Sequence, residues 1–183
     1  GDGGAFACFD CKFLSLHGRT KFLNNAAGRG GAVVIKDLRE PKSNRQSFVG
    51  DGVVFAGNNA TEGGGGAIYR SGIYTANFSG VVYENNAALY GNNRATEAVK
   101  AVAFRGDSRP PLSIFNNEPI NKPSISVRVL DFLGNIVKDR ANPVVIAAET
   151  LKADAPILSS SPTSIAVDAE TGTANFSEII LAG

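Results

Sequence analysis

The stretch Phe55-Ala-Gly-Asn-Asn-Ala-Thr-Glu-Gly-Gly-Gly-Gly-Ala-Ile68 decides the fold of this 183-residue chain. It places an aromatic residue three positions before an asparagine, and it ends in a Gly-Gly-Ala-apolar block. Both blocks recur upstream as Phe22-Leu-Asn-Asn25 and Gly30-Gly-Ala-Val33, and the first recurs downstream as Tyr83-Glu-Asn-Asn86. The aromatic residues lie 33 and 28 positions apart. This inexact period near 30 residues indicates stacked units joined by loops of variable length.

Short β-strands with tight corners account for each unit. Runs such as Val53-Val-Phe55 and Val81-Val-Tyr83 are β-branched and aromatic, have strand length, and are bounded by Gly or Asn. Helical spacing is absent, and each Gly would cost about 1 kcal/mol in a helix. Asn tolerates the left-handed backbone of a corner, and Gly allows a tight bend. We therefore predict a parallel β-helix with at most a turn or two of α-helix, around Thr96–Lys100.

The repeat also predicts which side chains form the core of this β-helix. The three aromatic rings are expected to stack at equivalent positions of successive turns, and the three asparagines to hydrogen-bond from turn to turn. These repeat-core residues are Phe22, Asn25, Phe55, Asn58, Tyr83 and Asn86.

The paired blocks resemble the polymorphic outer membrane protein repeat, known from chlamydial surface autotransporters and from large secreted proteins of algae and other protists. Two complete copies carry the resemblance, over about the first 100 residues. In the third, Tyr90-Gly91-Asn92 stands where Gly-Gly-Ala would follow, and a copy at Phe6 lacks its upstream half. The resemblance implies a right-handed β-helix used for surface display and adhesion. The incomplete first copy leads us to expect a piece of a longer chain.

The composition changes along the chain. Residues 1–118 hold 18 of the 21 Gly, whereas residues 119–183 hold five of the eight Pro. Proline fixes its own φ and restricts the residue before it, so a Pro-rich segment forms a stiff connector. The predicted organisation is a β-helix over 1–108, a linker over 109–122 and a second domain over 123–183.

The second domain has the alternating pattern of a half-buried strand. Ile125, Val127 and Val129 alternate with polar residues, and turn signals separate several further short strands. The pattern is similar to bacterial-type immunoglobulin-like domains of adhesins, and it is carried by these positions: Val127, Val129, Asp131, Gly134, Asn135, Gly172, Ala174, Phe176 and Ile179. The resemblance implies a β-sandwich, and about 60 residues fall short of the roughly 100 that such a domain needs. We therefore expect this sandwich to be incomplete.

Charge and residue usage narrow the classes of function. A net charge of +1 gives no broad electrostatic footprint for nucleic acid, and no apolar run reaches the roughly 18 residues of a membrane helix. The single histidine, His17, cannot supply a conventional catalytic triad or a His-rich metal site. We expect no catalytic residue, no metal and no cofactor.

Cys8 and Cys11 permit three interpretations, namely a local disulfide, two buried thiols or a bond to another turn. Cysteines three apart in a straight strand point to opposite faces, so a disulfide needs a turn at Phe9-Asp10. We expect the disulfide, given a secreted setting. Three sequons are glycosylation candidates if the protein is eukaryotic and secreted, at Asn59, Asn77 and Asn175. The tetrapeptide Arg105-Gly-Asp-Ser108 matches an integrin-recognition motif, but three letters carry little information and turn chemistry is the expected explanation.

These observations predict a non-enzymatic structural or adhesive module of a large extracellular surface protein or filament, for example a flagellar hair or a cell-wall component. The expected partners are neighbouring domains of the same parent chain or adjacent subunits of an assembly, with glycans or cell-surface proteins as further candidates. Nucleic acid and membrane insertion are not expected. The alternative is a carbohydrate-active β-helix enzyme, a polysaccharide lyase or a glycoside hydrolase, although the carboxylates are scattered in sequence.

Overall fold

The computed structural model describes residues 1–11, 13–36, 47–71, 75–105, 125–140, 144–147, 157–160, 164–176 and 179–182. Every regular element of these ranges is a β-strand, so the protein is all-β. The upper limit of a turn or two of helix is confirmed, and the place named for it, Thr96–Lys100, is instead occupied by the end of β12 (Arg94–Thr96) and the start of β13 (Ala98–Arg105). In the described ranges, no helix has the length and apolar character needed to cross a membrane.

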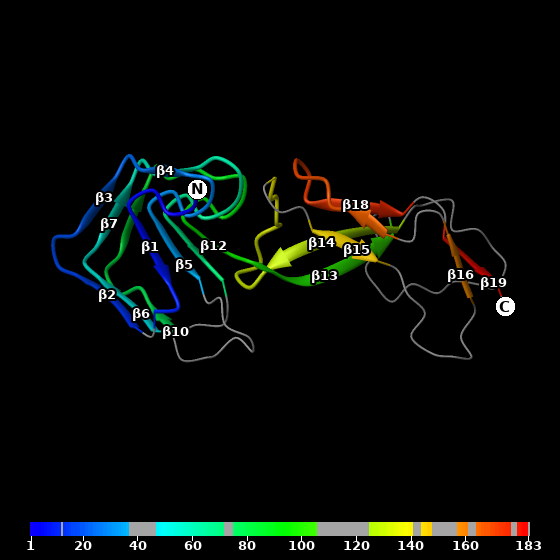
Figure 1. Ribbon diagram of the computed structural model, residues 1–183, viewed down its shortest axis with the longest axis horizontal. Coiled ribbons are helices and arrows are strands. Elements are labelled where there is room, and N and C mark those ends of the chain that lie inside the picture. Colours follow the sequence, from blue (N-terminus) through cyan, green and yellow to red (C-terminus); the bar gives the residue numbers. More distant parts are fainter. Residues whose placement is uncertain are drawn as a thin grey trace.

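Up to residue 96, the strands form parallel sheets to which each passage of the chain adds one strand (Figure 1). The four-stranded sheet contains β1 (Phe6–Phe9), β5 (Val33–Lys36), β9 (Ile68–Arg70) and β12, in this order. Two three-stranded sheets contain β2 (Phe13–His17), β6 (Ser47–Asp51) and β10 (Thr75–Asn77), and β3 (Lys21–Leu23), β7 (Val54–Ala56) and β11 (Val82–Glu84). The short strands β4 (Ala26–Ala27) and β8 (Asn59–Ala60) also pair in parallel.

The strand register relates equivalent residues of successive turns. Phe6 pairs with Val33, Val33 with Ile68, and Ile68 with Arg94 in the four-stranded sheet. A glycine with positive φ stands three residues before each of these positions, at Gly3, Gly30, Gly65 and Gly91. A Cβ on Gly30 would lie 2.2 Å from the Val33 carbonyl oxygen, so this corner requires glycine.

Gly91 therefore opens a corner that the sequence pattern does not show. The residues that follow it, Asn92 and Asn93, take the places of Gly-Ala in the earlier Gly-Gly-Ala blocks. The backbone thus completes the turn that begins at Tyr83, although its sequence has lost the block. The paired residue also changes in kind, because Arg94 stands where the two preceding turns hold Val33 and Ile68.

Beyond residue 97 the strands pair antiparallel. The central sheet has the order β13, β14 (Ile125–Asp131) and β18 (Thr173–Phe176). Two further pairs join β15 (Val145–Ala147) to β17 (Ser164–Ala166), and β16 (Ile157–Ser160) to β19 (Ile179–Ala182). Strand β13 thus pairs with the second half of the chain, although the division from sequence places it in 1–108. The predicted linker 109–122 lies outside the described residues.

Two apolar clusters meet across the four-stranded parallel sheet. Val33, Ile35 and Ile68 face the interior of the stacked turns, in a cluster with Phe55. Val34 and Tyr69, which alternate with them, join a second cluster that continues through Tyr90 and Ala95 into the antiparallel strands. Because both faces of the four-stranded sheet are covered, its strands β5 and β9 are almost entirely buried.

Candidate functional site

An aromatic column runs through the interior of the stacked turns. Phe22 and Phe55 have ring centroids 4.9 Å apart with planes inclined by 6°, and Phe55 and Tyr83 have centroids 5.7 Å apart with planes inclined by 15°. The register places all three at equivalent positions of β3, β7 and β11. Phe55 is fully buried between the other two rings. Such offset ring pairs add to the stability that apolar burial provides.

An asparagine ladder runs beside this column at the corner that follows the same three strands. The Asn25 backbone N–H and Nδ2 both donate to Asn58 Oδ1, at 3.0 and 2.9 Å. The Asn58 backbone N–H and Nδ2 donate in the same way to Asn86 Oδ1, at 3.0 and 2.9 Å. Asn86 Nδ2 donates to Phe55 O and to Asn93 Oδ1. Asn93, which stands where the earlier turns have the Ala of Gly-Gly-Ala, is therefore the last member of the ladder.

A disulfide links Cys8 to Cys11, whose Cα atoms are 5.9 Å apart. The intervening Asp10 has φ 54°, and its backbone N–H donates to Lys36 O. The chain therefore turns between the cysteines, as a bond across three positions requires. This bond closes the corner between β1 and β2 in the first turn.

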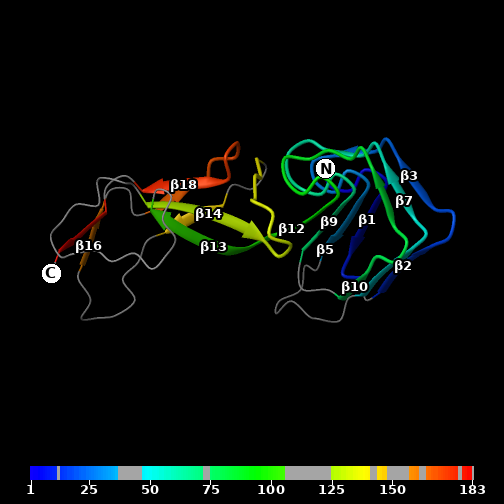
Figure 2. The same cartoon turned by 180° about the vertical axis from the view of Figure 1, so that it is seen from behind.

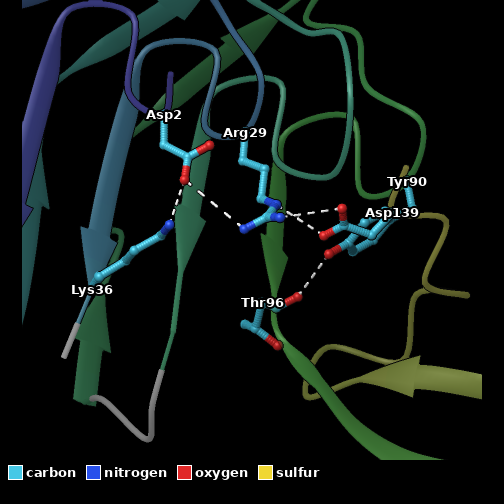
Figure 3. A network of polar contacts seen from close by, with 6 residues as sticks. All are labelled: Asp2, Arg29, Lys36, Tyr90, Thr96 and Asp139. Atoms are coloured by element: carbon cyan, nitrogen blue, oxygen red, sulfur yellow. Dashed lines mark hydrogen bonds and ion pairs between the residues drawn. The ribbon is translucent and has the colours of Figure 1, made fainter. Parts of the chain in front are cut away.

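The two halves of the chain meet at a buried ion pair (Figure 3). Arg29 Nε lies 2.9 Å from Asp139 Oδ2, and Arg29 Nη2 donates to Asp139 Oδ1 at 3.3 Å. Each of these side chains is only 8% exposed. Asp2 lies on the other side of Arg29, at 3.9 Å, and also pairs with Lys36. The guanidinium rests 5.7 Å above the centre of the Tyr69 ring, which fixes its plane.

Tyrosine hydroxyls line the same junction. Burial raises the pKa of Tyr69 to about 12, against the opposing effect of the Arg29 charge. Burial also raises the pKa of Tyr90, whose hydroxyl donates to Thr96 O at 3.1 Å. Both phenols therefore remain neutral hydrogen-bond donors throughout the physiological pH range.

A second polar connection joins β12 to the turn after β14. The Thr96 backbone N–H donates to Asp131 Oδ2 at 2.9 Å, and the Phe132 backbone N–H donates to Thr96 Oγ1 at 2.8 Å. Asp131 Oδ1 also accepts the backbone N–H groups of Leu133 and Asn135. The Asp-x-x-Gly-Asn signal of the sequence is thus a turn whose aspartate is buried and saturated with donors.

The remaining candidates from the sequence lie apart from the junction. The sequon residues Asn59, Asn77 and Asn175 are exposed. Ser126 Oγ donates to Asn175 Oδ1, and the Ser79 backbone N–H donates to Asn77 Oδ1. His17 is exposed at the end of β2 beside Ser15. Residues 106–108 of the Arg-Gly-Asp motif lie outside the described part of the chain.

The junction residues could not be identified from sequence. Arg29 precedes the Gly-Gly-Ala block as an ordinary loop cation, and Asp139 lies 110 positions away from it. The one available signal is that Arg29 stands among small residues in a corner, where a long charged side chain needs a partner. Within the described ranges, no group of three or more His, Cys, Asp or Glu residues has the arrangement of a metal site.

No family model, no curated protein and no solved structure matches this chain.

Proposed function

We propose that the chain is a non-enzymatic structural or adhesive module of a large extracellular surface protein or filament, such as a flagellar hair or a cell-wall component. The observation that carries this proposal is the junction, where one apolar cluster and the Arg29–Asp139 ion pair connect the stacked turns to the antiparallel strands. A module coupled in this way transmits force and orientation from one end to the other.

The overall arrangement suits that role. The stacked turns lie at one end of the molecule, the sheet of β13, β14 and β18 lies in the middle, and β16 and β19 lie at the far end (Figures 1 and 2). The described parts thus follow one another along the longest axis, as in a spacer.

For the architecture, we propose a right-handed parallel β-helix of the polymorphic outer membrane protein type, followed by an incomplete immunoglobulin-like sandwich. The ring column, the asparagine ladder and the parallel register of successive turns support the first part. The alternating burial of β14 between two antiparallel partners supports the second.

The proposed partners are neighbouring domains of the parent chain or adjacent subunits of an assembly, together with glycans or cell-surface proteins. The Cys8–Cys11 disulfide favours an oxidising compartment, because such bonds are rare in the cytosol. Exposed sequon asparagines are compatible with a glycoprotein at the cell surface.

Labelling of the producing cells tests this proposal. An antibody raised against the chain is applied to intact cells and, in parallel, to permeabilised cells. We expect label on the surface or along filaments of intact cells. Label that requires permeabilisation would contradict the proposed extracellular role.

A carbohydrate-active enzyme is the second candidate, because Asp2 and Glu62 line one pocket in the first turns. Paired carboxyl groups are what glycoside hydrolysis needs. Incubation with polygalacturonate and related polymers should yield no new reducing ends and no unsaturated product. Turnover that disappears in Glu62→Gln would establish the enzyme and refute the structural role.

A further inference from the structure

A pocket of about 560 Å³ lies where the last stacked turn meets the turn after β14. Its lining includes Tyr83, Asn92, Asn93, Arg94, Leu133 and Asn135. Ligand sites in proteins commonly occupy about 300–1,000 Å³. The lining combines one cation, three carboxamides, a phenol and an aliphatic side chain. It contains no carboxylate, so it offers binding groups without an acid pair for cleavage.

Arg94 gives the pocket its positive charge. It occupies the position that holds Val33 and Ile68 in the two preceding turns. Its guanidinium carbon lies 4.4 Å from the centre of the Phe78 ring and 5.9 Å from that of Tyr83, so cation–π contacts hold the group in place. No carboxylate of the described residues pairs with it. A planar guanidinium held in this way is suited to a bidentate contact with a carboxylate.

The neighbouring carboxamides are oriented by the hydrogen bonds they already make. Asn93 Oδ1 accepts from Asn86, which leaves its Nδ2 as a donor to the pocket. Asn135 Nδ2 donates to Asp131 Oδ2 and to Arg94 O, which leaves its Oδ1 as an acceptor. A fixed donor and a fixed acceptor in the lining of one pocket are what hydroxyl groups of a sugar require.

Two further groups fit the same ligand. The Tyr83 hydroxyl is buried without a hydrogen-bond partner in the described part of the chain, and buried polar groups of this kind call for an explanation. Burial raises the pKa of Tyr83 to about 12, against the nearby Arg94 charge, so the hydroxyl is a donor at neutral pH. Leu133, which is 38% exposed, offers an apolar contact for the C–H face of a sugar ring.

We propose that this pocket binds an acidic saccharide, namely a uronic-acid unit of an extracellular polysaccharide. Arg94 binds the carboxylate, Asn93 donates to a hydroxyl group, and Asn135 accepts from another. The inference rests on the proposed extracellular role and gives it a ligand class. The nearby Asp131 carboxylate is buried, and it accepts hydrogen bonds from Thr96, Leu133 and Asn135, so its charge is compensated within the turn.

Calorimetric titration of the chain with tetragalacturonate tests this assignment, with a neutral galactose tetramer as the comparison ligand. We expect binding of the acidic oligomer alone, with an affinity that falls as salt is raised. Arg94→Gln should weaken it at least tenfold. Arg140→Gln removes an exposed guanidinium that is absent from the pocket lining, so it should leave the affinity unchanged.

Arg94→Gln could perturb the turn, so Asn92→Glu provides a second test. Asn92 is exposed, and a carboxylate there should repel the acidic ligand and weaken binding about tenfold while the melting temperature is unchanged. Equal binding of the neutral oligomer, absence of binding, or binding that resists both substitutions would overturn the assignment. Surface labelling without saccharide binding would refute the proposed saccharide site and leave the proposed structural role intact. Cleavage of the oligomer would instead refute the structural role.

Discussion

Strands β9 and β14 are buried in different ways. All three residues of β9 are buried, whereas the seven residues of β14 alternate between buried and more accessible positions. β9 belongs to a parallel sheet with an apolar cluster on each face. β14 lies between two antiparallel partners and presents one apolar face.

The two halves differ in whether their stabilising contacts repeat along the chain. In the stacked turns, a ring or an amide interacts with its equivalent about 30 residues away, so the contacts are non-local and repeat along one axis. In the second half, the alternation that marks a strand is local, but the pairing is non-local and does not repeat, since Ile125 of β14 pairs with Phe176 of β18. The four-stranded sheet is shared between both, because one of its faces belongs to the cluster of the second half.

The largest expected effect comes from the ring column. Phe55→Ala removes the fully buried ring that contacts two others, and it should lower the free energy of unfolding by about 3–5 kcal/mol. Chemical denaturation measures the change. Phe132→Ala is the matched control, because Phe132 is 61% exposed and its loss should cost less than about 0.5 kcal/mol. Unchanged stability of the Phe55 variant would show that the column is not a core.

The second-largest expected effect is at the junction between the two halves, where Arg29 pairs with Asp139. Asp139→Ala removes the carboxylate 2.9 Å from the buried Arg29, which is closer than Asp2 at 3.9 Å, and it should cost about 3 kcal/mol. It should also separate one unfolding transition into two, because the halves lose the buried ion pair that joins them. Calorimetry detects the separation.

The exposed pair Arg140–Glu170 provides the control for this prediction. Glu170→Ala should cost less than about 1 kcal/mol, because salt bridges in solvent contribute little. The double variant Arg29→Met with Asp139→Leu should recover much of the stability, since neither member of the pair is then left as an uncompensated buried charge. Two transitions in the unaltered chain would contradict the coupling between the halves.

The sequence predicted those features that recur in it. The spacing of Phe22, Phe55 and Tyr83 led to the ring column, and the Asn of each block led to the ladder. The turn expected between Cys8 and Cys11 is present at Asp10. These predictions succeed because equivalent residues in a repeat meet one another by symmetry, without knowledge of the rest of the fold.

Features that occur once could not be predicted. The strand β13 pairs with β14 across the predicted linker, so a division by composition does not reveal the partner. The corner at Gly91 keeps the backbone conformation of the earlier corners although the Gly-Gly-Ala sequence is lost. The reason is that only the first glycine of each block has positive φ. Arg29 and Asp139 meet through packing of two dissimilar halves, and Arg94 enters a pocket that both halves build.

The asparagine ladder distinguishes the middle of the stack from its first turn. Asn58→Ala removes a fully buried amide that accepts two hydrogen bonds and donates two, and we expect a loss of about 3 kcal/mol. Asn25→Ala removes the half-buried first member and should cost about 1 kcal/mol. Equal losses from urea denaturation of both variants would contradict a ladder whose strength depends on having neighbours on both sides.

The disulfide of the first turn has a smaller expected effect than the ring column, the ion pair or Asn58. Cys8 and Cys11 are separated by three positions, so the bond restricts only a short loop of the unfolded chain, and its reduction should cost about 2 kcal/mol. The chain contains only these two cysteines, so a thiol reductant acts on no other bond. Hydrogen exchange should accelerate in β1 and β2, which flank the bond, and remain unchanged in β14. The Cys8→Ala, Cys11→Ala variant should not respond to reductant. Faster exchange in β14 upon reduction would mean that the first turn stabilises the whole molecule, and that the two halves are less distinct than their patterns of burial indicate.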